Sequence, residues 1–431
     1  MHLMNNSFTG TFQLPNFNHY KLAELEISSN NITGQLPKEF GLVLSNLQYI
    51  GMSRNSFHGN VPSSIGEVKG LHYMDLSNNN FSGMLPGSML GNGTDLSRLY
   101  LSNNNFSGMT SVDSLNINVH LSVLDISNNK LSGTIPIQLC NLSSLRFLDL
   151  SENRLFGSIP SCFNASSLSF LFLQKNSLSG SIPHVLSRSP NLVVLDLRDN
   201  KFTGNIPSWI NQLSKLRVLS LGGNALRGHI PNQLCQLRIV SIMDLSHNLL
   251  FGSIPSCFDN FSILKNMSFG NMGADNFGGE SVGFPKFFIA DHPLYNATLE
   301  FEATESLRAS YVTIFGIDSN PEHQQALAHV KIYLDALSNG ISQFSNLYHL
   351  DVSGNSISGE IPNVFGNRST LLSVIMRDNA FKDKISCEMF ASIVFYLDLS
   401  DNFLPGPIPS CEFSNVAHLS LQGNKISVGV Y

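Results

Sequence analysis

Charged residues are scarce in this 431-residue chain, at 13% of the sequence, and no block of Lys or Arg accompanies the net charge of −6. This balance argues against a protein that grips nucleic acid or anionic lipid electrostatically. No apolar run reaches the roughly 18 residues that a membrane-spanning helix needs. The N-terminus also lacks the basic start and apolar stretch of a signal peptide. Asn, Ser, Gly and Thr must therefore supply most of the polar surface.

Motifs of the common catalytic sites are also missing. The sequence has no G-x-S-x-G, no H-E-x-x-H, no P-loop, no kinase signature and no Cys/His set with metal spacing. The 13 His residues are scattered singly. We therefore predict no enzymatic activity, no cofactor and no metal.

One repeated unit dominates what is present. Leu192–Pro207 reads L-x-x-L-x-L-x-x-N-x-F-x-G-x-I-P, and the same pattern recurs at Leu145–Pro160, Leu216–Pro231 and Leu347–Pro362. The Asn of the unit recurs every 23 to 25 residues as far as Asn248 and resumes 107 residues later. Its positions are Asn6, Asn30, Asn55, Asn79, Asn104, Asn129, Asn153, Asn176, Asn200, Asn224, Asn248, Asn355, Asn379, Asn402 and Asn424. A fixed internal period of this length predicts a solenoid built coil by coil.

Each conserved type in the unit has a physical role. The alternation x-L-x-L-x is typical of a short strand with one buried face. Strands of neighbouring coils would pair in parallel, and the Asn amide would turn inward and bond across coils. The Gly permits a positive φ at the turn, and the Pro fixes φ on the outer side.

The unit resembles the plant-specific leucine-rich repeat, L-x-x-L-x-L-x-x-N-x-L-x-G-x-I-P. The resemblance implies an α/β-type repeat solenoid: a leucine-rich-repeat superhelix with a parallel inner β-sheet and one non-repeat insertion. The repeat after Asn104 lacks the I-P ending, and Asp383 replaces the Gly of a late repeat. The expected layout is leucine-rich repeats over 1–256, with the first repeat partial, an insertion over 257–340 and four further repeats over 341–431.

The insertion breaks the pattern completely. Near its end, Asn320 as N-cap, Pro321 at the first helical position and one apolar face predict a helix at about 321–338. A segment of this size between late repeats resembles the island domain of plant receptor-like proteins and receptor kinases. The alternative is a decayed run of three repeats.

The six Cys fall into three pairs, Cys140/Cys162, Cys235/Cys257 and Cys387/Cys411. In the first two pairs the local sequence repeats one coil apart, which places each pair near the spacing of a disulfide. The third pair has a similar separation but a less regular context. Disulfides indicate an oxidising compartment. The alternative is six buried free thiols.

Eleven N-x-S/T sequons agree with an extracellular protein, although an Asn- and Ser-rich repeat generates some by chance. The expected glycosylation sites are Asn5, Asn31, Asn80, Asn92, Asn105, Asn141, Asn164, Asn260, Asn266, Asn296 and Asn367. Apart from Asn5, none falls on an outward strand position of the inner sheet.

Departures from the repeat consensus on the inner sheet mark candidate binding residues. The predicted ligand-binding residues form two patches, Tyr49, Tyr73, Arg98 and Tyr100 in one, and Phe170, Phe172, Gln174, Lys175, Arg198, Asp199 and Arg217 in the other. Exposed Tyr, Phe and Arg carry much of the energy at interfaces. Neutral drift on a solvated sheet is the alternative.

An aspartate column also runs along the inner sheet. Its members are Asp75, Asp125, Asp149, Asp196, Asp244 and Asp351. The column could suggest cation binding, but it is explained more simply as the consensus Asp of L-D-L-S.

The resemblance implies the ligand-recognition ectodomain of a plant receptor-like protein. It would bind a peptide, glycan or microbial protein on the concave face and signal through a partner or adaptor receptor kinase in defence or development. The expected location is the extracellular face of the plasma membrane, or a secreted form, with no membrane span in this chain. Missing end caps lead us to expect a fragment or truncated product. The alternative is a secreted inhibitor of a cell-wall-degrading enzyme, against which the insertion argues.

Overall fold

The computed structural model forms two compact units, one of Met1–Phe261 with Leu347–Tyr431 and the other of Ser262–Asn346. The structure describes residues 1–14, 21–91, 94–109, 120–163, 166–260, 347, 349–359, 361, 373–390, 396–411, 416 and 418–427. All of these lie in the first unit. The predicted helix at 321–338 and most of the predicted insertion lie outside the described residues, so the expected domain limits stay a prediction.

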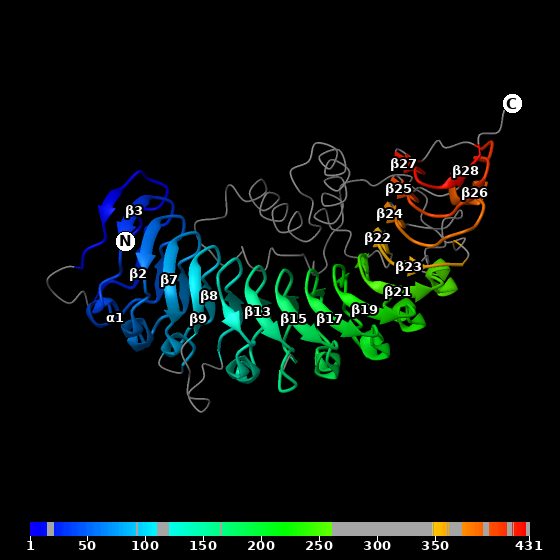
Figure 1. The fold of residues 1–431 in the computed structure, drawn as a ribbon. Helices are drawn as coiled ribbons and strands as arrows, with labels where there is room; N and C mark the ends of the chain where they lie inside the picture. The colour runs from blue at the N-terminus through cyan, green and yellow to red at the C-terminus, as the bar shows by residue number, and fades with distance from the viewer. Residues whose placement is uncertain are drawn as a thin grey trace, which may run out of the picture. The chain divides into compact units, whose positions relative to one another are not determined.

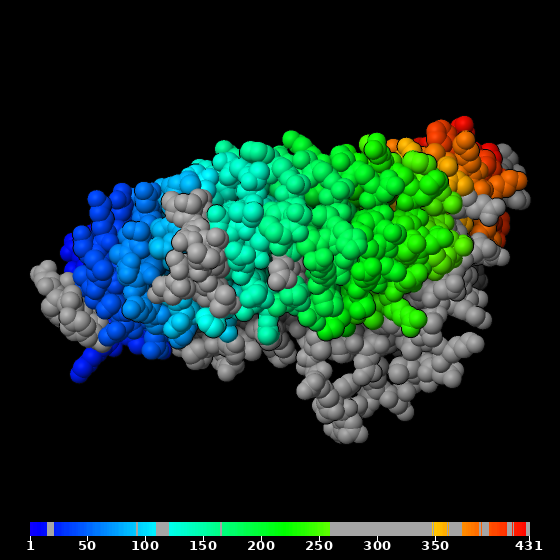
Figure 2. Space-filling view, turned by 90° about the horizontal axis from the view of Figure 1, so that it is seen from below, coloured from blue at the N-terminus to red at the C-terminus, as the bar shows by residue number. Residues whose placement is uncertain are grey.

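The first unit is a solenoid in which the first strand of each described repeat, from the repeat of Asn30 onward, joins one parallel 14-stranded sheet (Figure 1). We call it the long sheet. Its strands are β2 (Glu24–Glu26), β4 (Tyr49–Gly51), β6 (Tyr73–Asp75), β8 (Arg98–Tyr100), β10 (Val123–Asp125), β12 (Phe147–Asp149), β14 (Phe170–Phe172), β16 (Val194–Asp196), β18 (Val218–Ser220), β20 (Ile242–Asp244), β22 (His349–Asp351), β24 (Ser373–Ile375), β25 (Tyr396–Asp398) and β27 (His418–Ser420). Successive coils follow one another in chain order, as the colours of Figure 2 show from blue to green. The predicted leucine-rich-repeat architecture is confirmed.

A second strand follows the Asn of most described repeats and pairs in parallel with its counterparts. These strands are β1 (Thr9–Thr11), β3 (Asn31–Gly34), β5 (Ser56–Gly59), β7 (Asn80–Leu85), β9 (Asn105–Met109), β11 (Ser132–Gly133), β13 (Arg154–Gly157), β15 (Ser177–Gly180), β17 (Lys201–Gly204), β19 (Ala225–Gly228), β21 (Leu249–Gly252), β23 (Ser356–Ile357), β26 (Pro405–Gly406) and β28 (Lys425–Ile426).

Short helices complete many of the described coils, and most of them begin directly after the consensus Pro, along the lower edge of the view in Figure 1. The described helices are α1 (Phe40–Val43), η1 (Ser63–Glu67), η2 (Gly87–Leu90), η4 (Ile137–Asn141), η5 (His184–Arg188), η6 (Ser208–Gln212), η7 (Asn232–Gln236), η8 (Ser256–Asn260) and η10 (Cys387–Phe390). Apolar side chains from strand and helix, such as Leu195 and Ile210, are fully buried between the coils. Burying one such side chain contributes about 1.5–3 kcal/mol.

The Asn ladder binds neighbouring coils together. Asn200 Nδ2 donates to the carbonyl oxygens of Leu197 and Arg198 in its own coil and, at 2.9 Å, to that of Leu173 in the preceding coil. Its Oδ1 accepts the backbone N–H of Leu178 at 2.9 Å. One amide therefore satisfies backbone groups of two coils.

The register continues across the predicted insertion. Strand β20 pairs directly with β22, with Ile242 opposite His349, although about 100 residues separate them in the sequence. The ladder is also unbroken, because Asn355 Nδ2 donates to the carbonyl oxygen of Leu245 and its Oδ1 accepts the backbone N–H of Leu250.

A left-handed backbone residue precedes the ladder Asn in nearly every described repeat. Its φ is 54° at Lys175 and 52° at Asp199. This conformation is uncommon for residues other than Gly and is most accessible to Asn and Asp. The backbone conformation, and not ligand binding, therefore limits which residues can precede the ladder Asn.

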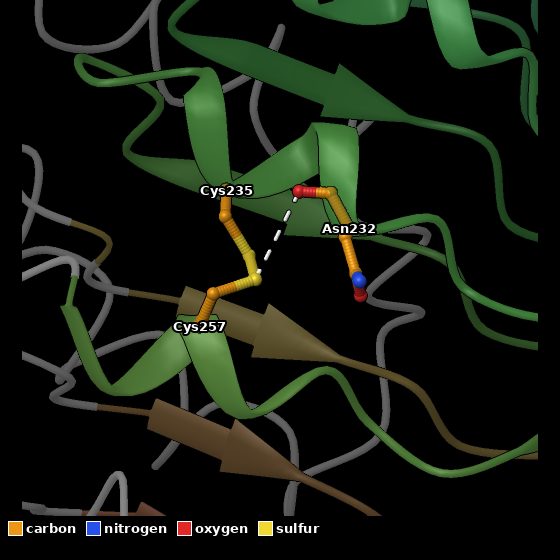
Figure 3. Close-up of a disulfide and its surroundings, with 3 residues drawn as sticks. All are labelled: Asn232, Cys235 and Cys257. Atoms are coloured by element: carbon orange, nitrogen blue, oxygen red, sulfur yellow. Dashed lines mark hydrogen bonds between the residues drawn. A yellow bond between two sulfur atoms is a disulfide. The ribbon is translucent and has the colours of Figure 1, made fainter.

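Two of the three predicted disulfides are present. Cys140 pairs with Cys162 and Cys235 with Cys257, each closing a separation of 22 residues between adjacent coils. Figure 3 shows the second bridge, which joins η7 to η8 and leaves Cys257 Sγ 3.8 Å from the carbonyl oxygen of Asn232.

The third predicted disulfide is wrong for this structure, in which Cys387 and Cys411 are free thiols. The two paired sets join one 3₁₀ helix to the corresponding residue of the next coil, with a constant separation. Cys411 lies 24 residues after Cys387 instead of the 22 residues of both bridges, and its Sγ donates to the Pro409 carbonyl oxygen at 3.7 Å. Desolvation, and then the neighbouring Cys387 thiol, raise the pKa of Cys411 to about 11.

We predict that Asn153→Ala lowers the free energy of unfolding by about 1–3 kcal/mol, because buried backbone groups of two coils lose their partner. Asn153 Oδ1 accepts the N–H of Leu131, and its Nδ2 donates to the carbonyl oxygen of Ile126. Urea denaturation measures the change. Asn211→Ala, which removes a solvent-facing bond to Gln236, serves as the control and should stay within about 0.5 kcal/mol of the parent. Equal losses in the two variants would contradict the role of the ladder.

We also predict that iodoacetamide labels two thiols of the native protein, as counted by mass spectrometry. Cys387 is exposed and should react first. Cys411 should react slowly at pH 8 because its thiolate forms only at higher pH. Labelling of no thiol would show that the third bridge forms after all.

Candidate functional site

The inner face of the long sheet carries side chains in straight columns, because the strands pair without a shift. The first residue of each strand aligns with the first residue of the next, and the third with the third. The middle residue, such as Leu148 or Leu171, points into the core and is fully buried. A ligand approaching this face would therefore meet two parallel columns of side chains.

The first predicted patch is a stack of tyrosines. The rings of Tyr49 and Tyr73 are parallel within 5° and 4.4 Å apart, and Tyr100 lies 5.7 Å from Tyr73. Tyr49 Oη donates to Glu26 Oε2 at 2.8 Å. Arg98 occupies the same column as Tyr49 and Tyr73. The structure therefore brings all four predicted residues together.

The stacking of the tyrosine rings limits which groups of the first patch are available to a ligand. Tyr49 and Tyr73 each cover one face of the other's ring, and the hydroxyl of Tyr49 is bonded to the carboxylate of Glu26. Desolvation raises the pKa of both phenols above the ordinary value, and nearby carboxylates add to the shift. The hydroxyls therefore stay protonated and remain hydrogen-bond donors. Gly51 makes room for the carboxylate of Glu26, with which a Cβ at that position would collide.

The second predicted patch is divided by the structure. Phe170 and Phe172 on β14 are half-buried and lie 6.1 and 5.6 Å from the ring of Phe147, which the sequence reasoning did not select. Gln174 follows on the same face and is 3% exposed. Arg198 is 5% exposed and donates to both carboxylate oxygens of Asp196 at 2.9–3.2 Å.

The other three predicted residues lie away from these aromatic side chains. Lys175 and Asp199 are exposed and occupy the left-handed turn beyond the strands. Lys175 Nζ donates to Glu152 Oε1 at 2.9 Å across the neighbouring turn. Arg217 directly precedes β18 and so lies at the beginning of the strand, at the end opposite to this turn. Turn geometry explains the first two positions better than binding.

The aspartate column has a structural role. Asp149 Oδ1 accepts the backbone N–H of Ser151 at 2.8 Å, two residues on, which fixes the chain as it leaves the strand. The same bond recurs at Asp75, Asp125, Asp196, Asp244, Asp351 and Asp398. This supports the explanation by repeat consensus. Among the described residues, no group of three or more His, Cys, Asp or Glu side chains could hold a metal ion.

The column nevertheless places carboxylates side by side at two points, which the sequence reasoning missed. Asp125 is the direct partner of Asp149, and Asp244 that of Asp351. Desolvation raises the pKa of Asp125 and Asp149, and the charge of Asp125 adds to the shift at Asp149. Knowledge of which strands are neighbours was needed to find these pairs.

The sequons that the structure describes leave this face uncovered. Asn5, Asn31, Asn80 and Asn141 are exposed, and Asn105 is half-buried with its Nδ2 bonded to Asn80 Oδ1. Asn31, Asn80 and Asn105 begin strands of the second set instead of the long sheet. The remaining predicted sites Asn92, Asn164, Asn266, Asn296 and Asn367 lie outside the described residues, as does the side chain of Asn260. Glycosylation stays a prediction.

Comparison with known families agrees with the fold. The leucine-rich-repeat family models match residues 94–155 and 190–250 in one case, and 21–42, 70–92 and 346–368 in the other. The ectodomain of the Arabidopsis thaliana receptor kinase GASSHO1/SCHENGEN3, in complex with CASPARIAN STRIP INTEGRITY FACTOR 2, aligns with a TM-score of 0.74 and 24% identity over 99% of this chain and 41% of its own. The plant peptide hormone receptor RGFR1, in complex with RGF2, aligns with a TM-score of 0.71 and 26% identity over 99% of this chain and 55% of its own. The chain thus has the leucine-rich-repeat fold.

Curated proteins with similar sequences point to one group of leucine-rich-repeat proteins. Receptor-like protein 14 of Arabidopsis thaliana is 50% identical over 68 residues, and receptor-like protein 45 of the same plant is 43% identical over 67 residues. Together with the structural similarities, they support a plant leucine-rich-repeat receptor-like protein. Each match covers 16% of this chain and 7% of the relative. Within the described residues, no helix is both long and apolar enough to cross a membrane.

We predict that the free energy of unfolding increases as the pH falls from about 8 to 5. Desolvation raises the pKa of Asp196 to about 6 and that of Asp351 to about 7, against about 3.9 in an unfolded chain. These two aspartates bind protons more tightly in the folded state, which lower pH therefore favours. Desolvation lowers the pKa of His349 to about 4, which opposes this trend below pH 6.5 but is outweighed by the two aspartates together. Urea denaturation at several pH values measures the trend. Asp351→Asn should flatten it, and stability that rises with pH would contradict it.

Proposed function

We propose that the long sheet is the ligand-recognition surface of an extracellular receptor-like ectodomain. The observation that carries the proposal is the gathering of aromatic side chains on the inner face, two of which, Tyr100 and Phe172, stand where the repeat consensus has Asp. Tyr73 and Tyr100 contact one another at one end of the face, and Phe147, Phe170 and Phe172 at the centre. Half-buried aromatic side chains combine large contact area with few rotamers, which favours binding.

Several observations support an extracellular location. Two disulfides join adjacent coils, and such bonds persist in oxidising compartments. Exposed sequons lie off the long sheet, so that sugar there would leave the sheet accessible. Relatives known as receptor-like proteins, and peptide-bound ectodomains of the same fold, favour a peptide or protein ligand. Signalling through a partner receptor kinase is part of this proposal, and catalysis is not.

We expect Tyr73→Ala and Phe172→Ala each to weaken ligand capture at least tenfold, as at interface hot spots worth about 2 kcal/mol. The secreted protein, immobilised through its C-terminus, is incubated with plant extracellular fluid, and bound molecules are eluted and quantified by mass spectrometry. Circular dichroism confirms that each variant folds.

The matched control is Phe156→Ala, which removes an aromatic ring that is 53% exposed on β13, outside the long sheet. This variant should capture the same molecules as the parent. Loss of capture in Phe156→Ala with full capture in the other two variants would place the binding surface outside the long sheet.

A further inference from the structure

The side-by-side carboxylates of Asp125 and Asp149 are the starting point. They stand at equivalent positions of β10 and β12, on strands about 4.8 Å apart. Both side chains are half-buried, and neither forms a salt bridge with a residue that the structure describes. Asp196, in the same column, instead has the guanidinium of Arg198 on both its oxygens. Two like charges at this distance repel one another, so that either one carboxyl takes up a proton or a cation lies between them.

Aromatic rings stand at both ends of this pair in the same column. Tyr100 is the direct partner of Asp125, and Phe172 that of Asp149. Phe147 begins the strand of Asp149, and its ring lies 5.6 Å from that of Phe172. Cations bind favourably against aromatic rings, and more strongly where water is excluded. The order Tyr, Asp, Asp, Phe along one column therefore combines both elements of a cation-binding surface.

An unsatisfied acceptor beside the pair points independently to a missing donor. Gln174, two residues after Phe172 on the same face, lies level with Ser151 on the neighbouring strand that carries Asp149. Its side chain is 3% exposed, and its Oε1 has no hydrogen-bond partner among the described residues. A buried acceptor without a partner costs about 1–3 kcal/mol. A ligand that brings N–H groups to this spot would satisfy it.

We propose that Asp125 and Asp149, flanked by Tyr100 and Phe172, bind a basic side chain of a peptide ligand lying along the inner face. Arginine fits best, because its planar guanidinium carries five donors, can bond to two carboxylates at once and stacks on aromatic rings. This inference rests on the proposed function and gives it a ligand class. A positively charged ligand is favoured because the two carboxylates accept hydrogen bonds and the two rings attract a cation.

A peptide library tests the inference without knowledge of the natural ligand. Acetylated, amidated octapeptides with all amino acids except Cys randomised are passed over the immobilised protein at 0.15 M salt, and the retained peptides are sequenced. The parent protein should enrich Arg or Lys at one position about tenfold over the input. Free spermidine at millimolar concentration, which carries charge without peptide contacts, should not displace the retained peptides.

The test variant is Asp125→Asn with Asp149→Asn. Asn keeps the oxygen that accepts the backbone N–H two residues on, so the strand ends are preserved while both charges are removed. Enrichment of basic residues should fall to the input level in this variant. Asp398→Asn changes the equivalent position of β25, where the same bond to Ser400 exists, and should leave the enrichment unchanged.

The outcomes separate this inference from the proposed function. Retained peptides without a preference for Arg or Lys, or a preference that survives in the double variant, would overturn the cation site and leave the ligand face intact. Displacement by spermidine would show a polyamine site and overturn the peptide assignment. Failure of the proposed function is detected separately, by capture that does not depend on Tyr73 or Phe172.

Discussion

The hydrogen bonds of one Asn side-chain amide per repeat hold the coils of this structure together. Each ladder Asn donates to carbonyl oxygens of its own coil and the preceding coil, and accepts a backbone N–H from that coil, as Asn200 and Asn153 show. These backbone groups could not pair otherwise, because the chain leaves the sheet where they occur. An unmet buried group costs about 1–3 kcal/mol, so every rung must be filled and the coils are held at one spacing. The straight columns of the inner face follow directly from that constant spacing.

The same constraint explains how the solenoid accommodates a long insertion. The paired strands and the amide ladder continue from β20 and Asn248 to β22 and Asn355 as though the coils were consecutive. Closing a longer loop adds only slowly to the entropic cost of folding, while the continued ladder retains the full energy of one inter-coil interface. The disulfides between η4 and Cys162 and between η7 and η8 act on the opposite side from the sheet, where no ladder holds the coils.

On such a regular scaffold, chemistry comes from substitutions at positions that the repeat does not need. The Asp of the consensus holds the end of its strand, and replacing it with Tyr100 or Phe172 gives up that bond in favour of a ring on the inner face. Asp125 and Asp149, the consensus aspartates between these two rings, are direct neighbours, and their negative charges repel one another. The binding surface that we propose thus combines ordinary and altered repeats.

The sequence by itself determined the repeat, its period, the parallel sheet, the ladder and two of the three disulfides, since each depends on residues at fixed spacing within one or two coils. It also selected Tyr49, Tyr73, Arg98 and Tyr100, which the structure brings together. It could not separate Lys175 and Asp199 from the binding candidates, because their left-handed backbone appears only in three dimensions. It gave Cys387 and Cys411 a bridge that the late, irregular coils do not form. The pairing of Asp125 with Asp149, the bond between Arg198 and Asp196 and the unsatisfied Gln174 were decided by tertiary structure alone, because each depends on which side chains of successive coils stand next to one another.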